Sequence, residues 1–90
     1  IFYNIHNMEI DELDVLFEKI DNVKNRITDM MFANIVTGLD NSRIYSVDKY
    51  IEYCILNISD KRLLKEVSIS SVSWYTKLLA LAKLEGRLED

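Results

Sequence analysis

The sequence predicts an all-α fold, a small four-helix domain, and three observations support it. Apolar residues make up 49% of the 90-residue chain and charged residues 29%, a balance that favours a folded core and excludes disorder. There is no proline and there are only two glycines, whereas β-sandwiches and barrels need frequent turn residues. Apolar side chains recur every three or four positions, the spacing of one helix face.

Residues 1–90 are expected to form a single helical domain, because one hydrophobic core of this size accounts for the whole length. The chain begins with Ile1 and stops at Asp90 without a natural terminal signal. We therefore expect it to be a domain of a longer protein.

The first predicted helix is the longest and covers residues 8–37. Asn7 can cap it, and Gly38 lies where a helix commonly stops. Its apolar residues alternate at spacings of three and four, the 3.5-residue period of a bundle or coiled-coil seam: Leu13, Leu16, Ile20, Val23, Ile27 and Met30.

Three shorter helices are expected after a linker at residues 39–46, where Asp40, Asn41 and Ser42 are turn formers. Their predicted ranges are residues 47–58 with Ser46 as the cap, residues 60–67 with Ser59 or Asp60 as the cap, and residues 72–84 with Gly86 near the end. Residues 1–5 and 68–73 could alternatively form short strands.

The predicted core combines the first helix with the later three. The expected core residues are Leu13, Leu16, Phe17, Ile20, Val23, Ile27, Tyr50, Ile51, Cys54, Ile55, Leu63, Leu64, Val67, Trp74, Leu78 and Leu81. Trp74 is expected on the inner face of the last helix, because Leu78 and Leu81 follow it at spacings of four and three. Tyr75 and Lys77 would then point to solvent or to a partner.

Several functional classes are disfavoured by the residues present. His6 is the only histidine and has no nearby triad partners, and the two glycines are too far apart for a phosphate-binding loop. The chain is therefore expected to be non-catalytic, with no cofactor, metal or small-molecule substrate. No apolar run approaches the length that crosses a bilayer, so no membrane contact is expected. Cys54 cannot form an internal disulfide and lies in an apolar stretch, which favours a buried thiol and an intracellular location, cytoplasmic or nuclear.

The closing stretch, SDKRLLKEVSISSVSWYTKLLALAKLEGRLED, covers residues 59–90 and pairs a short helix with a longer one across a serine-rich turn. It resembles a helix-turn-helix in its winged-helix form, including the PCI-type domains that end helical scaffolds. It departs from that pattern at Ser68, where glycine is usual, and at Trp74, where a smaller apolar residue is usual. The resemblance implies a surface for protein or DNA. The candidate contacts are Arg62, Lys65, Ser71, Tyr75, Thr76 and Lys77.

The first helix offers a second candidate contact through Lys19, Lys24 and Arg26, which flank its apolar seam. A parallel homodimer would oppose these like charges, so the seam is expected either to pack within its own domain or to dock against an acidic partner helix.

Two functions are expected from these patterns. The first is a non-catalytic module for protein interaction, assembly or self-association within a larger intracellular protein. The alternative is a helix-turn-helix DNA-binding domain. The net charge of −4 opposes DNA binding, although the basic residues near the closing stretch favour it.

Overall fold

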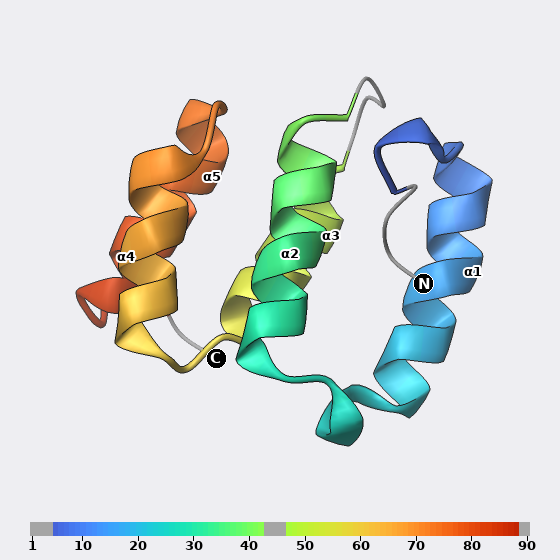
Figure 1. The fold of residues 1–90 in the computed structure, drawn as a ribbon, viewed down its shortest axis with the longest axis horizontal. Helices are drawn as coiled ribbons and strands as arrows, with labels where there is room; N and C mark the ends of the chain where they lie inside the picture. Colours follow the sequence, from blue (N-terminus) through green and yellow to red (C-terminus); the bar gives the residue numbers. More distant parts are fainter. Residues whose placement is uncertain (1–4, 43–46, 89–90) are drawn as a thin grey trace.

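The computed structural model describes residues 5–42 and 47–88 (Figure 1). The described residues form helices only, so the all-α prediction is confirmed. The α-helices are α1 (Ile10–Asn22), α2 (Asp29–Asp40), α3 (Asp48–Leu56), α4 (Lys61–Ser70) and α5 (Trp74–Leu84), and short 3-10 helices cover η1 (Ile5–Asn7) and η2 (Lys24–Arg26).

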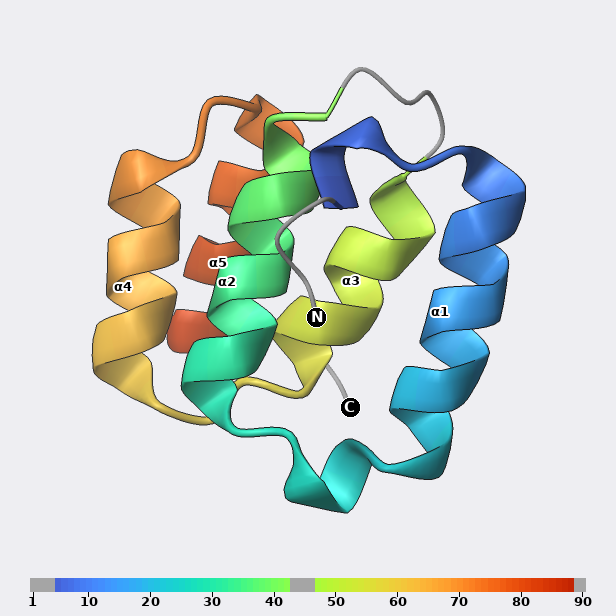
Figure 2. The ribbon, with the colours of Figure 1, turned by 45° about the vertical axis from the view of Figure 1, so that its right-hand side comes forward.

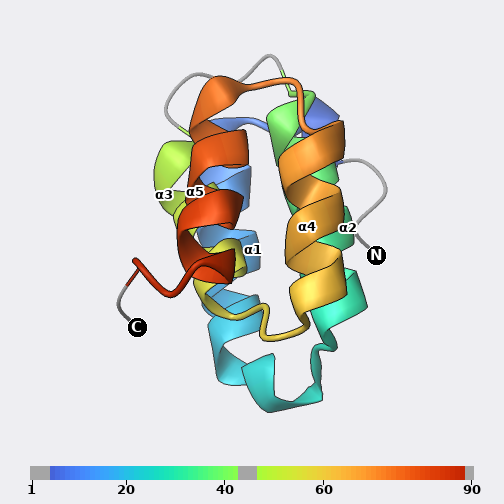
Figure 3. The same cartoon turned by 90° about the vertical axis from the view of Figure 1, so that its left-hand side faces the viewer.

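The helices lie in three groups along the longest axis of the domain: α4 with α5 at one end, α2 with α3 in the middle, and α1 at the other end (Figure 1). The turned view in Figure 2 shows α3 between α2 and α1. Figure 3 looks onto α4 and α5, which lie side by side and run in opposite directions. Helix α1 and the α4–α5 pair therefore lie at opposite ends of the domain.

The predicted first helix is wrong as one piece, because the structure divides it into α1 and α2. Helix α1 ends at Asn22, the chain passes through η2, and Thr28 then caps α2 by accepting a hydrogen bond from the Met31 amide at 3.2 Å. Thr28 followed by Asp29 is a normal helix start, with a capping hydroxyl and an acidic residue in the first turn. The 3.5-residue period continued across this break and concealed it.

The prediction that Gly38 ends a helix is wrong, because α2 continues through it to Asp40. Its role is to let η1 approach the helix. A Cβ built on Gly38 would lie 2.8 Å from Cγ2 of Ile5, whose side chain is fully buried. The missing side chain therefore allows Ile5 to pack directly onto the backbone of α2.

Helix starts agree with the sequence in part. Asp60 caps α4 by accepting hydrogen bonds from two backbone amides, so it is the cap of the two that were predicted, Ser59 and Asp60. Asn7 is wrong as the cap of α1, since Glu9 and Glu12 form a capping box there. Ser73 caps α5, which begins two residues later than predicted. Ser46, the cap predicted for residues 47–58, lies outside the described residues.

Residues 68–73 form the end of α4 and the turn to α5, so the strand alternative is wrong there. Helix α4 runs three residues further than predicted, through Ser70. Ile5 belongs to a 3-10 helix, and residues 1–4 of the other suggested strand lie outside the described residues.

Most of the predicted core is confirmed. The predicted residues that are buried are Leu13, Phe17, Ile20, Tyr50, Ile51, Cys54, Ile55, Leu64 and Val67, while Leu16, Ile27 and Leu63 pack against the core half-buried. Val23, Trp74 and Leu78 are exposed, so their placement in the core is wrong, and Leu81 is half-exposed. Helix α2 adds buried residues that were not in the predicted set: Phe32, Ala33, Ile35, Val36 and Leu39.

Two aspartates of α2 fix both ends of α4. The Asp29 carboxylate accepts hydrogen bonds from the backbone amides of Ser59 and Asp60 at 2.9 and 2.8 Å, just before α4 begins. The Asp40 carboxylate accepts from the amides of Val72 and Ser73 at 2.6 and 3.1 Å, just after α4 ends. Both turns around α4 are thus anchored to α2 by charge-assisted bonds, which hold the α4–α5 pair in place.

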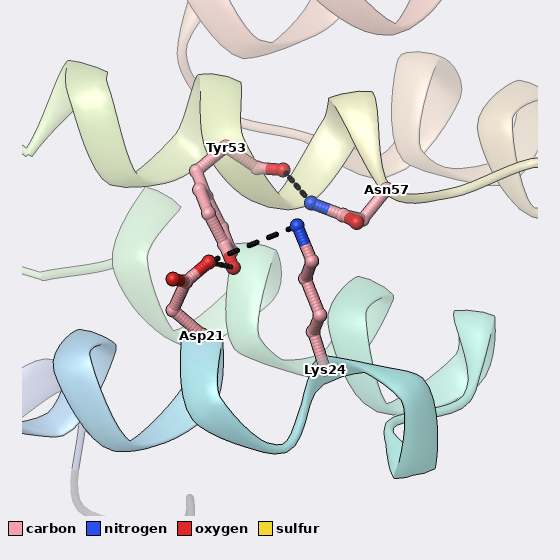
Figure 4. Close-up of polar contacts among 4 residues, drawn as sticks. All are labelled: Asp21, Lys24, Tyr53 and Asn57. Carbon is pink, nitrogen blue, oxygen red and sulfur yellow. Dashed lines mark hydrogen bonds and ion pairs between the residues drawn. The ribbon is translucent and has the colours of Figure 1, made fainter.

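Helix α1 joins the domain through aromatic residues of α3. The Phe17 ring lies 4.6 Å from the ring of Tyr50 and meets that of Tyr53 edge-on at 5.7 Å. The Tyr53 hydroxyl donates to Asp21 at 2.7 Å, and Lys24 lies 3.8 Å from the same carboxylate (Figure 4). Burial, reinforced by the hydrogen bond and charge of Asp21, raises the pKa of Tyr53 to about 12.

Candidate functional site

Helix α5 faces the core with its smallest residues. Ala80 and Thr76 are both fully buried and lie four positions apart, on one face of the helix. Small side chains allow two helices to approach closely, and α5 packs more extensively against α4 than any other helix pair in the domain. The buried face of α5 is therefore the one that carries Thr76 and Ala80.

This orientation places the bulky residues of α5 on the outside. Trp74 is 73% exposed and Leu78, one turn later, is 54% exposed. The sequence predicted both residues in the core because their spacing with Leu81 matches a helix face. The three residues do share one face of α5. The face that they define is the outer one.

A continuous stretch of chain supplies most of the exposed apolar side chains. Nine large apolar residues are exposed in the described part of the chain, and five of them lie between residues 69 and 78. Ile69 is 65% exposed at the end of α4, and Val72 is 71% exposed in the turn. We call Ile69, Val72, Trp74 and Leu78 the α4–α5 apolar surface.

Tyr75 lies at the edge of this surface, on the side of α5 that faces α3. It is 38% exposed, which agrees with its prediction as an outward residue. Partial burial raises the pKa of the Tyr75 hydroxyl, with a further contribution from the carboxylates of Glu52 and Asp48 on α3. Its ring can contact a partner while its neutral hydroxyl remains near two acidic side chains.

The lysines of α5 hold the ends of neighbouring helices. Lys77 donates a hydrogen bond from Nζ to the carbonyl oxygen of Ile69 at 3.2 Å, in the last turn of α4. Lys83 donates to the carbonyl oxygen of Leu56, the last residue of α3. A cation at a helix C-terminus interacts favourably with the helix dipole. Both lysines therefore have structural roles, and Lys77 has its role next to the apolar surface.

The basic residues of α4 differ in their surroundings. Lys61, Lys65 and Ile69 recur every four residues and are all exposed, so the two lysines continue the side of α4 that bears Ile69. Arg62 instead lines an open hollow of about 520 Å³ with Met30 and Leu63, between α4 and the start of α2. The predicted contacts Arg62 and Lys65 are both exposed and lie three residues apart on α4, but only Arg62 lines this hollow.

Of the predicted contact residues, Thr76 is wrong as a surface contact and Ser71 is limited in that role. Thr76 is fully buried, and its hydroxyl has no hydrogen-bond partner among the described residues. Ser71 is half-buried, and its hydroxyl donates to the carbonyl oxygen of Val67 at 2.6 Å, which helps to end α4. The Thr76 hydroxyl is therefore not presented to solvent, and the Ser71 hydroxyl is engaged within α4.

The predicted contacts of the first helix gather around the connection between α1 and α2. Lys19 and Arg26 line an apolar groove of about 300 Å³, whose floor and walls include Leu16, Val23 and Ile27. Lys24 is absent from this lining and pairs with Asp21 instead. A second groove of about 420 Å³ adjoins the first one and shares Leu16 and Lys19 with it.

The described residues bear on two kinds of chemistry, thiol reactivity and metal binding. Cys54 is fully buried, as predicted, and burial raises the pKa of its thiol, which suppresses the reactive thiolate. Within residues 5–42 and 47–88 there is no cluster of three or more His, Cys, Asp or Glu side chains that could hold a metal ion. None of the helices in these ranges is long and apolar enough to cross a bilayer. The side chain of His6 lies outside the described part.

None of the family models, curated proteins or solved structures with which the chain was compared matches it. The site is therefore defined by its own geometry. Sequence reasoning missed Ile69, Val72 and Leu78 as surface residues. The signal that could have found Leu78 is the pair Thr76 and Ala80, which offers a small-residue face opposite Trp74 and Leu78.

Proposed function

We propose that this domain is a non-catalytic protein-interaction module that binds a partner through the α4–α5 apolar surface. The observation that carries the proposal is Trp74, which is 73% exposed two residues after the exposed Val72 and one helical turn before the exposed Leu78. Tryptophan is enriched at interfaces and among the residues that contribute most to binding energy. Contiguous apolar patches on soluble proteins often mark interaction sites.

The charges around this surface define the chemistry of the partner. Lys61 and Lys65 lie on the same side of α4 as Ile69, and no ion pair involves either lysine within the described ranges. Lys61 lies in the first turn of α4, where the helix dipole disfavours a cation, so helix stability does not explain it. The partner is a protein whose apolar side chains are flanked by carboxylates, which would pair with these lysines.

The likeness of residues 59–90 to a helix-turn-helix remains a prediction, and with it the alternative of DNA binding. The exposed cations Lys61, Arg62 and Lys65 favour that alternative. The outer face of α5 carries Trp74 and Leu78 in place of the Arg, Asn or Gln side chains that read base edges. A protein partner fits this face better. Retention on duplex DNA at low salt that weakens steeply as salt rises would favour the alternative.

Site-directed photo-crosslinking tests the proposed function. A photoreactive amino acid replaces Trp74 or Leu78 in the protein as expressed in its own cells, and the matched control replaces Asn34, which is exposed on α2. The proposal predicts one discrete protein adduct at positions 74 and 78 and none at position 34. The purified partner should then lose at least tenfold in affinity for the Trp74→Ala/Leu78→Ala variant. The absence of an adduct at both positions, or equal adducts at all three, would refute the proposal.

A further inference from the structure

The exposed flank of α1 carries a strip of apolar and charged residues whose order is self-complementary. Within α1, Glu12, Val15, Leu16 and Lys19 have the spacing of a single helix face. Met8 before the helix and Val23 after it extend this face, because each lines one of the two adjoining grooves. We call these six residues the α1 strip.

From its centre, the strip reads apolar, charged, apolar in both directions along the helix, and the charge is negative in one direction and positive in the other. A two-fold axis between Val15 and Leu16 places three pairs of residues across from each other: Val15 with Leu16, Glu12 with Lys19, and Met8 with Val23. Each pair joins one copy of the chain to the other. An apolar centre is thus flanked by two ion pairs and closed at both ends by apolar contacts.

We propose that a second copy of this chain docks on the α1 strip, so that two α1 helices pack antiparallel across a two-fold axis. Closed two-fold dimers are the commonest homo-oligomers, and their interfaces require a surface that is complementary to itself. Charge selects the direction. A parallel pairing would place Glu12 against Glu12 and Lys19 against Lys19, whereas the antiparallel pairing joins opposite charges.

The side chains of the strip are available for this contact. Glu12, Val15, Lys19 and Val23 are exposed, and Met8 and Leu16 are half-buried. One Glu12 oxygen, Oε1, accepts from the Glu9 amide at 2.9 Å, but a carboxylate accepts through both of its oxygens. Lys19 makes no ion pair with the described residues.

The dimer would be weak, because a single helix pair buries less than the ~800 Å² per partner of a standard interface. It would also be functionally distinct from the site proposed above. Helix α1 lies at the opposite end of the domain from α4 and α5 (Figure 1), so both copies of the α4–α5 apolar surface would remain free. The dimer would then be bivalent toward a partner, which raises avidity without any new contact.

Charge reversal with sedimentation equilibrium tests the proposal. Glu12→Lys and Lys19→Glu should each weaken self-association at least about tenfold, because each variant creates two like-charge contacts in the dimer. An equimolar mixture of the two variants should recover dimers, and so should the double variant, since both restore opposite charges. The matched control is Glu18→Lys, which reverses one exposed charge on α1 outside the strip and should have no effect.

Single-cysteine pairs test the direction of packing, and the buried native Cys54 does not interfere. Mixed Glu12→Cys and Lys19→Cys chains should form a disulfide with each other. Glu12→Cys alone should not, because seven helical residues separate its two copies by about 10 Å in the antiparallel dimer.

A protein that stays monomeric at every concentration would overturn the proposal, as would dimers that ignore the charge reversals or that cross-link through Glu12→Cys alone. Dimers that are lost in Trp74→Ala but retained in Lys19→Glu would place self-association on the α4–α5 apolar surface, which also overturns it. A monomer that still forms partner adducts at positions 74 and 78 would remove only this proposal, and the proposed function would stand.

Discussion

Replacing Gly38 with alanine should destabilise the domain, although alanine is the better helix former. A β-carbon at position 38 would lie 2.8 Å from Cγ2 and 3.4 Å from Cβ of Ile5, whereas carbon atoms are most stable at about 3.5–4.0 Å. Ile5 is fully buried, so its branched side chain cannot move into solvent. Overpacking of this kind costs roughly 1–3 kcal/mol, and the helix propensity of alanine returns about 1 kcal/mol. The net expected loss is up to about 2 kcal/mol.

A double-mutant cycle separates the steric contact from other effects. Ile5→Ala removes Cγ2 and costs roughly 2–5 kcal/mol by itself. In that background Gly38→Ala should become stabilising by about 1 kcal/mol, because only the gain in helix propensity remains. Gly86→Ala is the control: Gly86 has a positive φ of 76° and no atoms within 4 Å of a built Cβ, so its cost should be the same in both backgrounds.

The measurement is the free energy of unfolding from urea titrations of the parent, the three single variants and the two double variants. A coupling energy near zero between positions 5 and 38 would refute the reasoning, because it would mean that the two residues do not touch. A Gly38→Ala variant that is more stable than the parent would refute it as well.

Three further predictions concern single side chains. Trp74→Ala should lower the free energy of unfolding by less than about 1 kcal/mol in thermal melts, since the side chain is 73% exposed; a loss of about 3–5 kcal/mol would mean that it is a core residue. Thr76→Val should raise the free energy of unfolding by about 1 kcal/mol, because it removes a buried hydroxyl that has no partner among the described residues; a lower melting temperature than the parent's would contradict this. The pKa of Tyr53 is about 12 in the folded protein and 10.0 at its ordinary value, so its contribution to stability is complete below pH 10 and lost as the pH rises toward 12. Tyr53→Phe should cost about 1 kcal/mol at pH 7 through loss of the bond to Asp21 and should reduce the alkaline fall in stability measured by urea titration; identical pH profiles for the two proteins would contradict it.

The helical class and most of the core could be predicted because they depend on composition and on local spacing. Tyr50, Ile51, Cys54 and Ile55 form a compact apolar face within nine helical residues, and all four are buried as expected. The break between α1 and α2 could not be seen from the same kind of pattern. The 3.5-residue period runs through Val23 and Ile27 without interruption, while the helix itself ends at Asn22.

The orientation of α5 was predicted wrongly because its sequence is apolar on more than one face. Trp74, Leu78 and Leu81 mark one face, and Thr76 and Ala80 mark another. Bulk alone favoured the first face as the buried one. The deciding factor is tertiary: α5 packs against both α4 and α3, and the face that carries Thr76 and Ala80 is the one that is buried. The position of α4, fixed through Asp29 and Asp40, depends on contacts about thirty residues apart that local spacing does not contain.

Collisional quenching of the fluorescence of Trp74, the only tryptophan in the chain, tests most directly the claim that α5 presents its bulky face to a partner. In the free protein we predict emission close to that of tryptophan in water and full access to iodide. Addition of the partner identified by cross-linking should shift the Trp74 emission to the blue and protect it from iodide, while the fold of the domain stays unchanged. A free protein whose tryptophan is already blue-shifted and protected would contradict the orientation of α5. A tryptophan that stays accessible in the complex would contradict the binding site.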